Sequence, residues 1–238
     1  MPRGSLRDYR AKRDFGHTAE PKGKVGRRRT AKLHYLIQKH DASRLHYDFR
    51  LEWNGTLMSW AVPKGPSENP DDKRLAVHVE DHPLAYGGFE GTIPEGEYGG
   101  GTVMLWDTGT WVPHQDDVDA ALKKGKLSFA LHGKRLQGDW ALVRLRGRGP
   151  KDRDNWLLIK ERDEHVKRSG KPITERETTS VKSGRDMRKI GAGKRIWHSK
   201  PRARATATEK PVILAAAGKS RTRRRTGVKK KRSARRAS

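Results

Sequence analysis

The chain of 238 residues contains no cysteine. This absence excludes disulfides and thiolate metal sites, and it is compatible with a reducing cytoplasm. No stretch approaches the roughly 18 consecutive apolar residues of a membrane span, and the first 15 residues lack the apolar region of a secretion signal. We therefore expect a soluble cytoplasmic protein that does not bind membranes. We also expect it to be a monomer.

Acidic residues are scarce. The chain has 28 Asp and Glu against 54 Lys and Arg, which gives a net charge of +26. Much of the excess lies in residues 171–238, which contain 23 Lys and Arg but only 4 Asp and Glu. Such a run is typical either of a solvated, disordered segment or of a segment that binds phosphate backbones and releases their counterions. Nucleic acid is thus the first partner to consider.

The distribution of apolar residues predicts three regions. Residues 1–30 form a basic N-terminal arm, and residues 31–168 contain short apolar and aromatic runs that are separated by turn residues. Residues 169–238 contain too little apolar side-chain area to offset the entropy of an ordered chain. We expect this last region to be a disordered, Lys/Arg-rich tail.

The middle region predicts an antiparallel sheet. The predicted strands are residues 45–51, 57–62, 74–80, 102–109, 126–133, 139–146 and 155–160. Asn54 and Gly55 predict a type I′ hairpin turn, because both tolerate positive φ. Residues 116–126 predict a helix that begins with Asp and ends with Lys. The expected fold is mainly β, a small antiparallel barrel of about seven or eight strands with one or two short helices.

Alternation along two strands divides their side chains between two faces. In residues 45–51 the predicted core face is Leu45, Tyr47, Phe49 and Leu51, and the polar face is His46, Asp48 and Arg50. In residues 74–80 the predicted core face is Leu75, Val77 and Val79, and the opposite face is Arg74, Ala76, His78 and Glu80. Both polar faces combine imidazole, carboxylate and guanidinium groups.

These residue types favour a metal and a phosphate. Imidazole nitrogen with carboxylate oxygen suits Mn²⁺, Fe²⁺, Co²⁺ or Zn²⁺, and a guanidinium group matches two phosphate oxygens. A single His-x-Asp pair also occurs on ordinary strands. In addition, His46, Asp48 and His82 match the facial triad of non-haem Fe(II) oxygenases, which stays an alternative.

Residues 33–67, 74–111 and 155–163 carry a more specific pattern, which includes HDASRLHYDFRLEWNG and VEDHPLAYGGFEGTIPEGEYGGGT. In their order and spacing they resemble the 3′-phosphoesterase domain of bacterial DNA ligase D, which also occurs as a free-standing protein. The resemblance covers roughly residues 8–165. Because 238 residues leave no room for ligase and polymerase domains, we expect the protein to act alone or with separate partners.

The resemblance implies a manganese-dependent hydrolase of non-homologous end joining. In that family a phosphodiesterase step removes a 3′-terminal ribonucleoside, and a phosphomonoesterase step then removes the 3′-phosphate to leave a 3′-OH. The implied metal ligands are His40, His46 and Asp48, with Mn²⁺, Co²⁺ or another divalent transition metal. The other implied site residues are His82, Arg50, Tyr86, Glu80, Lys64, Arg74, Arg13, Asp14 and Glu20.

The same resemblance implies the substrates, the partners and the location of the protein. The substrates are DNA or RNA-tipped DNA 3′ ends, and the expected partners are a separate ATP-dependent ligase, a polymerase and an end-binding protein at the bacterial nucleoid. His82 is expected to hydrogen-bond the phosphate or to donate a proton to the leaving oxygen. A non-catalytic, basic DNA-end-binding protein of the same fold is the other alternative.

Overall fold

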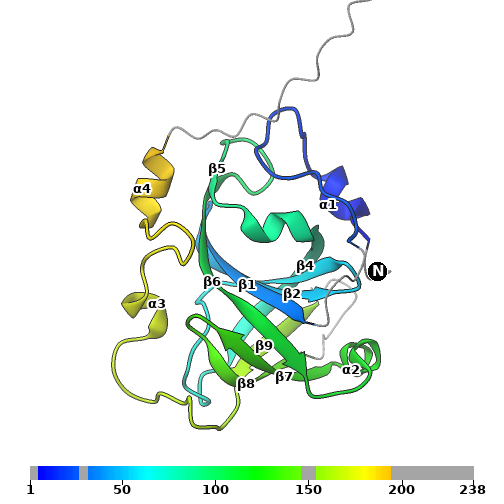
Figure 1. Ribbon diagram of the computed structural model, residues 1–238, viewed down its shortest axis with the longest axis vertical. Coiled ribbons are helices and arrows are strands. Elements are labelled where there is room, and N and C mark those ends of the chain that lie inside the picture. Colours follow the sequence, from blue (N-terminus) through cyan, green and yellow to red (C-terminus); the bar gives the residue numbers. More distant parts are fainter. Residues whose placement is uncertain (1–4, 27–31, 146–153, 194–238) are drawn as a thin grey trace, which may run out of the picture. The chain divides into compact units, whose positions relative to one another are not determined.

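The computed structural model describes residues 5–26, 32–145 and 154–193, and these form a closed antiparallel barrel with short helices outside it (Figure 1). The barrel strands are β1 (Leu33–Asp41), β2 (Leu45–Trp53), β3 (Thr56–Val62), β4 (Arg74–Pro83), β6 (Gly101–Pro113), β7 (Lys126–Gly133), β8 (Gln137–Arg144) and β9 (Asn155–Lys160). Their order is β1-β2-β3-β4-β9-β8-β7-β6, and pairing of β1 with β6 closes the barrel. The short β5 (Gly91–Ile93) pairs with the start of β6. The predicted fold class is therefore confirmed.

Local signals explain the best-predicted elements. Asn54 and Gly55 have φ values of 48° and 78°, as a type I′ turn between β2 and β3 requires. Helix α2 (Val118–Lys124) begins where the Asp117 side chain accepts a hydrogen bond from the Ala120 amide, and it ends at Gly125. The other described helices are α1 (Arg7–Ala11), the 3₁₀ helix η1 (Leu84–Gly88), α3 (Ile173–Arg176) and α4 (Met187–Ala192). No helix in the described part of the chain is long and apolar enough to cross a membrane.

The interior of the barrel is filled with aromatic and aliphatic side chains. Four tryptophans, Trp60, Trp106, Trp111 and Trp140, are at most 1% exposed. A second apolar cluster lies on the outer face of the barrel, under α1 and η1. It consists of Tyr9, Leu36, Leu57, Tyr86 and Leu105. Because the interior is packed, the outer face beside this second cluster is where a polar site can form.

Strand β1 was not predicted, because it is buried on both faces. Tyr35 and Ile37 belong to the barrel interior, and Leu36 belongs to the outer cluster. A strand covered on both sides reads as a continuous apolar run instead of an alternating one. This strand carries His40 near its end.

The predicted faces hold for β2 but not for β4. In β2, Tyr47, Phe49 and Leu51 face the interior, whereas Leu45, at the rim, is 46% exposed. The predicted core face of β4 is wrong, because Ala76 is in the interior and Leu75 is 41% exposed.

The register between β3 and β4 explains how the polar residues of β4 reach the outer face. Ser59 pairs with Val79, but Leu57 pairs with His82, so one extra residue is inserted in β4. Such a bulge reverses the alternation of side chains. Beyond it, Glu80 and His82 contact residues of the N-terminal arm on the outer face.

The predicted start of the disordered tail at residue 169 differs from the structure. Residues 169–193 are described, and Ile173 and Ile190, which are 3% and 2% exposed, join the barrel core. Two isolated isoleucines give no periodic signal, so the sequence did not reveal this packing. The predictions for residues 27–30 and 194–238 lie outside the described residues.

Candidate active site

The hairpin of β1 and β2 brings His40, His46 and Asp48 together on the outer face. His40 pairs directly with His46 in the register, and their ring centroids are 4.8 Å apart. His40 Nδ1 lies 3.6 Å from Asp48 Oδ2, and His46 Nε2 lies 3.7 Å from Asp48 Oδ1. One ligand atom from each residue lies within 4.8 Å of the others, so the group can hold a metal ion.

Backbone carbonyls orient both imidazoles. His40 Nε2 is 2.9 Å from the carbonyl oxygen of Gly99, and His46 Nδ1 is 2.9 Å from that of Arg44. Because a carbonyl only accepts, each of these nitrogens donates a hydrogen to it. The other nitrogen of each ring faces the Asp48 carboxylate. This is the usual arrangement around histidines that bind metals, and the donor set suits a divalent transition metal.

Arg50 lies next to Asp48 and is 2% exposed. Its Nη2 donates to Asp48 Oδ2 over 3.1 Å, its Nε to Gln38 over 3.0 Å, and its Nη1 to Ser59 over 2.7 Å. Burial alone would raise the pKa of Asp48, but the charge of Arg50 and the contacts with the two histidines hold that pKa below its usual range. The Asp48 carboxylate is therefore ionised and available to a cation.

Ser59 lies between Arg50 and His82 and contacts both. His82 Nδ1 donates to the Glu80 carbonyl over 2.9 Å and lies 3.4 Å from Ser59 Oγ. Burial, followed by the charges of Arg50 and Arg13, lowers the pKa of His82 well below its usual value. The ring is consequently neutral near pH 7, and its Nε2 accepts from Arg13 Nη2 over 3.3 Å.

The Tyr86 ring completes this side of the site. It packs against the ring of His82 at 4.8 Å and lies 4.9 Å from the Arg50 guanidinium. Burial raises the pKa of Tyr86 well above its usual value, so the phenol stays protonated.

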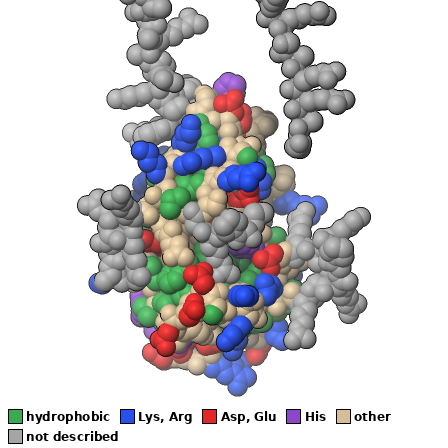
Figure 2. Space-filling view, turned by 90° about the vertical axis from the view of Figure 1, so that its right-hand side faces the viewer, with side chains coloured by type: hydrophobic (Ala, Val, Ile, Leu, Met, Phe, Trp, Pro, Cys, Tyr) green, Lys and Arg blue, Asp and Glu red, His purple; other side chains and the backbone are tan. Residues whose placement is uncertain are grey.

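The N-terminal arm covers the site. Arg13 donates to Glu20 over 2.8 Å and to Glu80 over 3.2 Å, and thereby connects the arm with β4. Tyr9 is completely buried against the rings of His82 and Tyr86. Figure 2 shows several Lys and Arg side chains around hydrophobic ones at the upper end of this face. Arg13, Glu20 and Glu80 thus lie together beside His82.

Three predicted residues lie apart from the cluster. The Asp14 side chain is 63% exposed and accepts from the Gly16 amide. Lys64 is exposed in the turn after β3, and Arg74 donates to Asp72 over 2.8 Å. The strand registers place Lys64 and Arg74 at the same end of the barrel as His46, but we find no contact with the three clustered residues within the described chain.

The sequence reasoning also missed residues that hold the site together. Gln38 accepts from Arg50, and its own amide donates to the carbonyls of Tyr86 and Phe89. Ser59 links Arg50 with His82. Both are fully buried polar residues within apolar runs. A polar residue in such a run was the available signal, because buried polar groups need partners.

His82 lies outside the group of His40, His46 and Asp48. Both of its ring nitrogens are engaged by Glu80 and Arg13, and the group of possible ligands consists of His40, His46 and Asp48. The triad of His46, Asp48 and His82, which the oxygenase alternative proposed, is therefore not formed.

Comparisons with known proteins identify the family of the chain. Residues 38–144 match the family model described as the DNA Ligase D 3′-phosphoesterase domain. A relative from Pseudomonas aeruginosa, the "Multifunctional non-homologous end joining protein LigD", is 57% identical over 159 residues, which are 66% of this chain and 19% of the relative.

Mycobacterial relatives give the same result. The "Multifunctional non-homologous end joining DNA repair protein LigD" of Mycobacterium tuberculosis is 44% identical over 168 residues, which are 68% of this chain and 21% of the relative. The Mycolicibacterium smegmatis LigD is 40% identical over 164 residues, 67% of this chain and 21% of the relative. The chain thus spans only about a fifth of the length of these relatives. The matched region includes His40, His46 and Asp48, and the chain belongs to the DNA ligase D 3′-phosphoesterase domain family.

Proposed function

We propose that this protein is a Mn²⁺-dependent phosphoesterase that removes 3′-terminal ribonucleosides and 3′-phosphates from DNA ends and leaves a 3′-OH. The observation that carries the proposal is the convergence of ligand atoms from His40, His46 and Asp48 beside the buried guanidinium of Arg50. Family membership supports a phosphoesterase, and the names of the relatives, which refer to end joining, support DNA ends as substrates.

A metal ion held by the two imidazoles and the carboxylate would supply Lewis acidity to a phosphoryl oxygen and lower the pKa of a bound water. Arg50 would contact the other phosphoryl oxygens. The hydrogen bonds found within the described residues use three of its five N–H groups. Its position is fixed by Gln38 and Ser59, so little reorganisation is needed when charge develops on those oxygens.

His82 has a role that depends on the substrate. Without a phosphate, its neutral ring accepts from Arg13. A phosphate dianion between Arg13 and Arg50 would offset the two positive charges that, after burial, lower the pKa of His82. Proton uptake by His82 would then accompany substrate binding. As water adds to phosphorus, this proton would pass to the leaving oxygen, which is the 5′ oxygen of the ribonucleoside in the phosphodiesterase step and the 3′ oxygen of the DNA in the phosphomonoesterase step.

The product fits a place in end joining. A 3′-OH is the group that a polymerase extends and that an ATP-dependent ligase seals, so both activities, with an end-binding protein, are the proposed partners. The relatives that match here are multifunctional end-joining proteins, which supports this setting. We place the activity at the bacterial nucleoid.

The test uses a primer-template that ends in a 3′-phosphate or a 3′-terminal ribonucleotide, with and without Mn²⁺. The expected result is conversion to a 3′-OH end only with the metal, and its loss in His46→Ala. A matched control is His34→Ala, because His34 is exposed on the same hairpin strand as His40 and far from the cluster.

Each alternative predicts a different result. DNA binding without conversion at any metal concentration would refute the enzyme and support the non-catalytic end-binding protein. Equal conversion by the wild-type chain and His46→Ala would refute the assignment of the metal site. For His82, a His82→Ala variant with full activity across the pH range would refute the proton transfer.

A further inference from the structure

After β9 the chain runs back along the outside of the barrel through α3 to α4 (Figure 1). We call residues 173–193 the strap. Hydrogen bonds join it to β6 and to the β7–β8 turn. The Val181 amide donates to Leu105 over 3.0 Å, Trp106 Nε1 donates to Glu177 over 2.7 Å, and Arg135 donates to Thr179 over 2.8 Å. These contacts make the strap part of the barrel domain.

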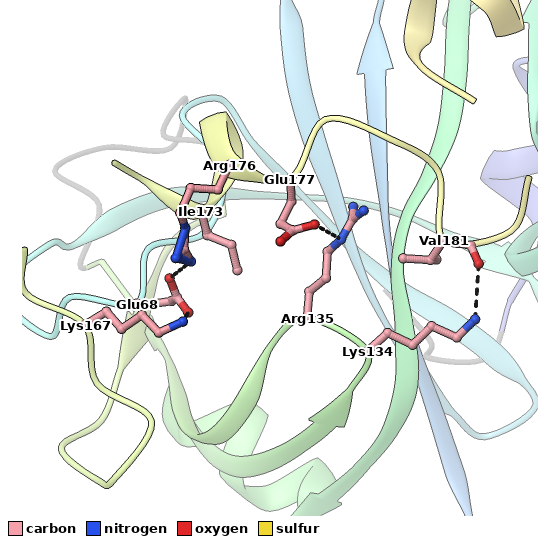
Figure 3. A pocket seen from close by; sticks show the side chains of 8 residues that line it. All are labelled: Glu68, Lys134, Arg135, Lys167, Ile173, Arg176, Glu177 and Val181. Carbon is pink, nitrogen blue, oxygen red and sulfur yellow. Dashed lines mark hydrogen bonds and ion pairs between the residues drawn. The ribbon is translucent and has the colours of Figure 1, made fainter. Parts of the chain in front are cut away.

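Ion pairs line a cavity of about 250 Å³ between the strap and the barrel (Figure 3). Arg176 of the strap pairs with Glu68, and Glu177 pairs with Arg135 over 3.1 Å. No residue that lines this cavity belongs to the predicted site. Because the charged groups that line the cavity are paired with one another across it, we interpret the cavity as part of the interface that attaches the strap, which we call the seam, and not as a binding site.

The middle of the strap is attached to the barrel domain through Glu90. Ser180 and Arg185 both bond the carboxylate of Glu90, whose side chain is 3% exposed. Burial would raise the pKa of Glu90, but the hydrogen bonds of these partners lower it, so the carboxylate stays charged. In α4, Ile190 enters the core, and the next residue, Gly191, lies against Thr102 of β6.

This attachment places α4 at the rim that carries the metal cluster. In the pairing of β1 with β6, Thr102 lies opposite Asp41, and Val103 lies opposite His40. Neighbouring strands are about 5 Å apart. The helix is therefore separated from the His40 strand by a single strand of the barrel.

The exposed charged side chains of the strap at this rim are basic. They are Lys182, Arg185, Arg188 and Lys189. The acidic groups nearby are engaged, since Glu90 bonds Ser180 and Arg185, and Asp186 caps α4 by accepting from the Lys189 amide. The sequence that follows, residues 194–238, has 17 Lys and Arg but only one acidic residue.

We infer that the rim of Lys182, Arg185, Arg188 and Lys189 binds the sugar-phosphate backbone of the DNA whose 3′ end enters the metal site. The inference rests on the proposed function. It places DNA binding on a defined surface beside the proposed metal site. The sequence alone had assigned DNA binding only to the basic tail as a whole. Binding there is independent of base sequence, because phosphates are the groups contacted.

The test compares two charge reversals in the full-length chain. The first is Arg188→Glu with Lys189→Glu in α4. The matched control is Lys123→Glu with Lys124→Glu, two exposed lysines that end α2 and lie away from the metal rim. Binding of a fluorescent primer-template with a 3′-phosphate is measured by anisotropy against salt concentration, in EDTA so that no hydrolysis occurs.

The α4 reversal should weaken binding and lower the slope of log K against log salt by about 2, since each lost phosphate contact removes about 0.9. The α2 reversal should leave the slope unchanged. Equal changes from both pairs, or no change from α4, would overturn the inference.

A second pair of variants and the absence of metal separate the possible causes of a negative result. If the glutamates unfold α4, the neutral pair Arg188→Gln with Lys189→Gln removes the same contacts and should lower the slope in the same direction. Because the assay contains no metal, a chain that binds as expected but converts no ends with Mn²⁺ refutes the proposed function and leaves this inference standing.

Discussion

The buried pair of Asp48 and Arg50 permits a quantitative test of the site. The two side chains are 10% and 2% exposed, and the guanidinium nitrogen lies 3.1 Å from the carboxylate oxygen. At an effective dielectric constant of about 20, this separation gives an attraction of about 5 kcal/mol, which opposes the cost of burying both charges. Removal of one partner leaves the other buried without compensation.

The variants are Asp48→Asn, Arg50→Met and the combination of the two. Each single change should lower the free energy of unfolding by about 3–5 kcal/mol. The double variant should lose clearly less than the sum, with a coupling of at least about 2 kcal/mol, because no uncompensated charge remains. Urea unfolding in EDTA at neutral pH measures all three without a contribution from bound metal.

An exposed ion pair supplies the control. Arg168 and Asp71 form an ion pair, and their side chains are 48% and 63% exposed. A double-mutant cycle with Arg168→Ala and Asp71→Ala should give a coupling energy below about 1 kcal/mol. The account of a buried, charged site would be wrong if the effects of the Asp48 and Arg50 substitutions on unfolding free energy were additive within error. It would also be wrong if their coupling were no stronger than that of this surface pair.

Three other predictions concern the metal, the pH and the strap. Mn²⁺ at about 100 times its Kd should raise the free energy of unfolding by about 2.7 kcal/mol, and His46→Ala should abolish this increase in thermal unfolding. Because the pKa of His82 is lowered on folding, only the unfolded chain takes up a proton there just below about pH 6.5. The free energy of unfolding should therefore decrease as the pH is lowered below about 6.5, by up to about 1.4 kcal/mol per pH unit. The decrease should be less steep in His82→Gln, as urea titrations at several pH values would show. Deletion of residues 194–238 should leave the urea midpoint unchanged, whereas deletion of residues 169–238 should cost about 3–6 kcal/mol through two lost isoleucines.

Prediction from the sequence succeeded where one strand face is apolar and the other polar. In β2 the alternation separated Phe49 from Asp48 and Arg50 correctly. It failed where packing or register breaks the alternation. Strand β1 is buried on both faces, and the bulge between Val79 and His82 in β4 changes which residues face the site without any mark in composition. His40 was thus found through resemblance and not through strand pattern.

The strap shows a second limit. Much of its attachment consists of hydrogen bonds between backbone groups and side chains, such as those of Trp106 and Arg135, and these leave no periodic signature. High charge and low apolar content predicted disorder for residues 169–193. Two buried isoleucines and several ion pairs across the seam were sufficient for order.

The site lies outside the barrel, so its burial depends on the arm. The interior is occupied by tryptophans and offers no room for a phosphate. On the outer face, Tyr9 covers His82 and Tyr86, and Arg13 ties Glu20 of the arm to Glu80 of β4. A charged pair such as Asp48 and Arg50 interacts strongly only when water is excluded. The arm therefore excludes water from the His82 side of a site whose proposed metal ligands all come from the β1–β2 hairpin.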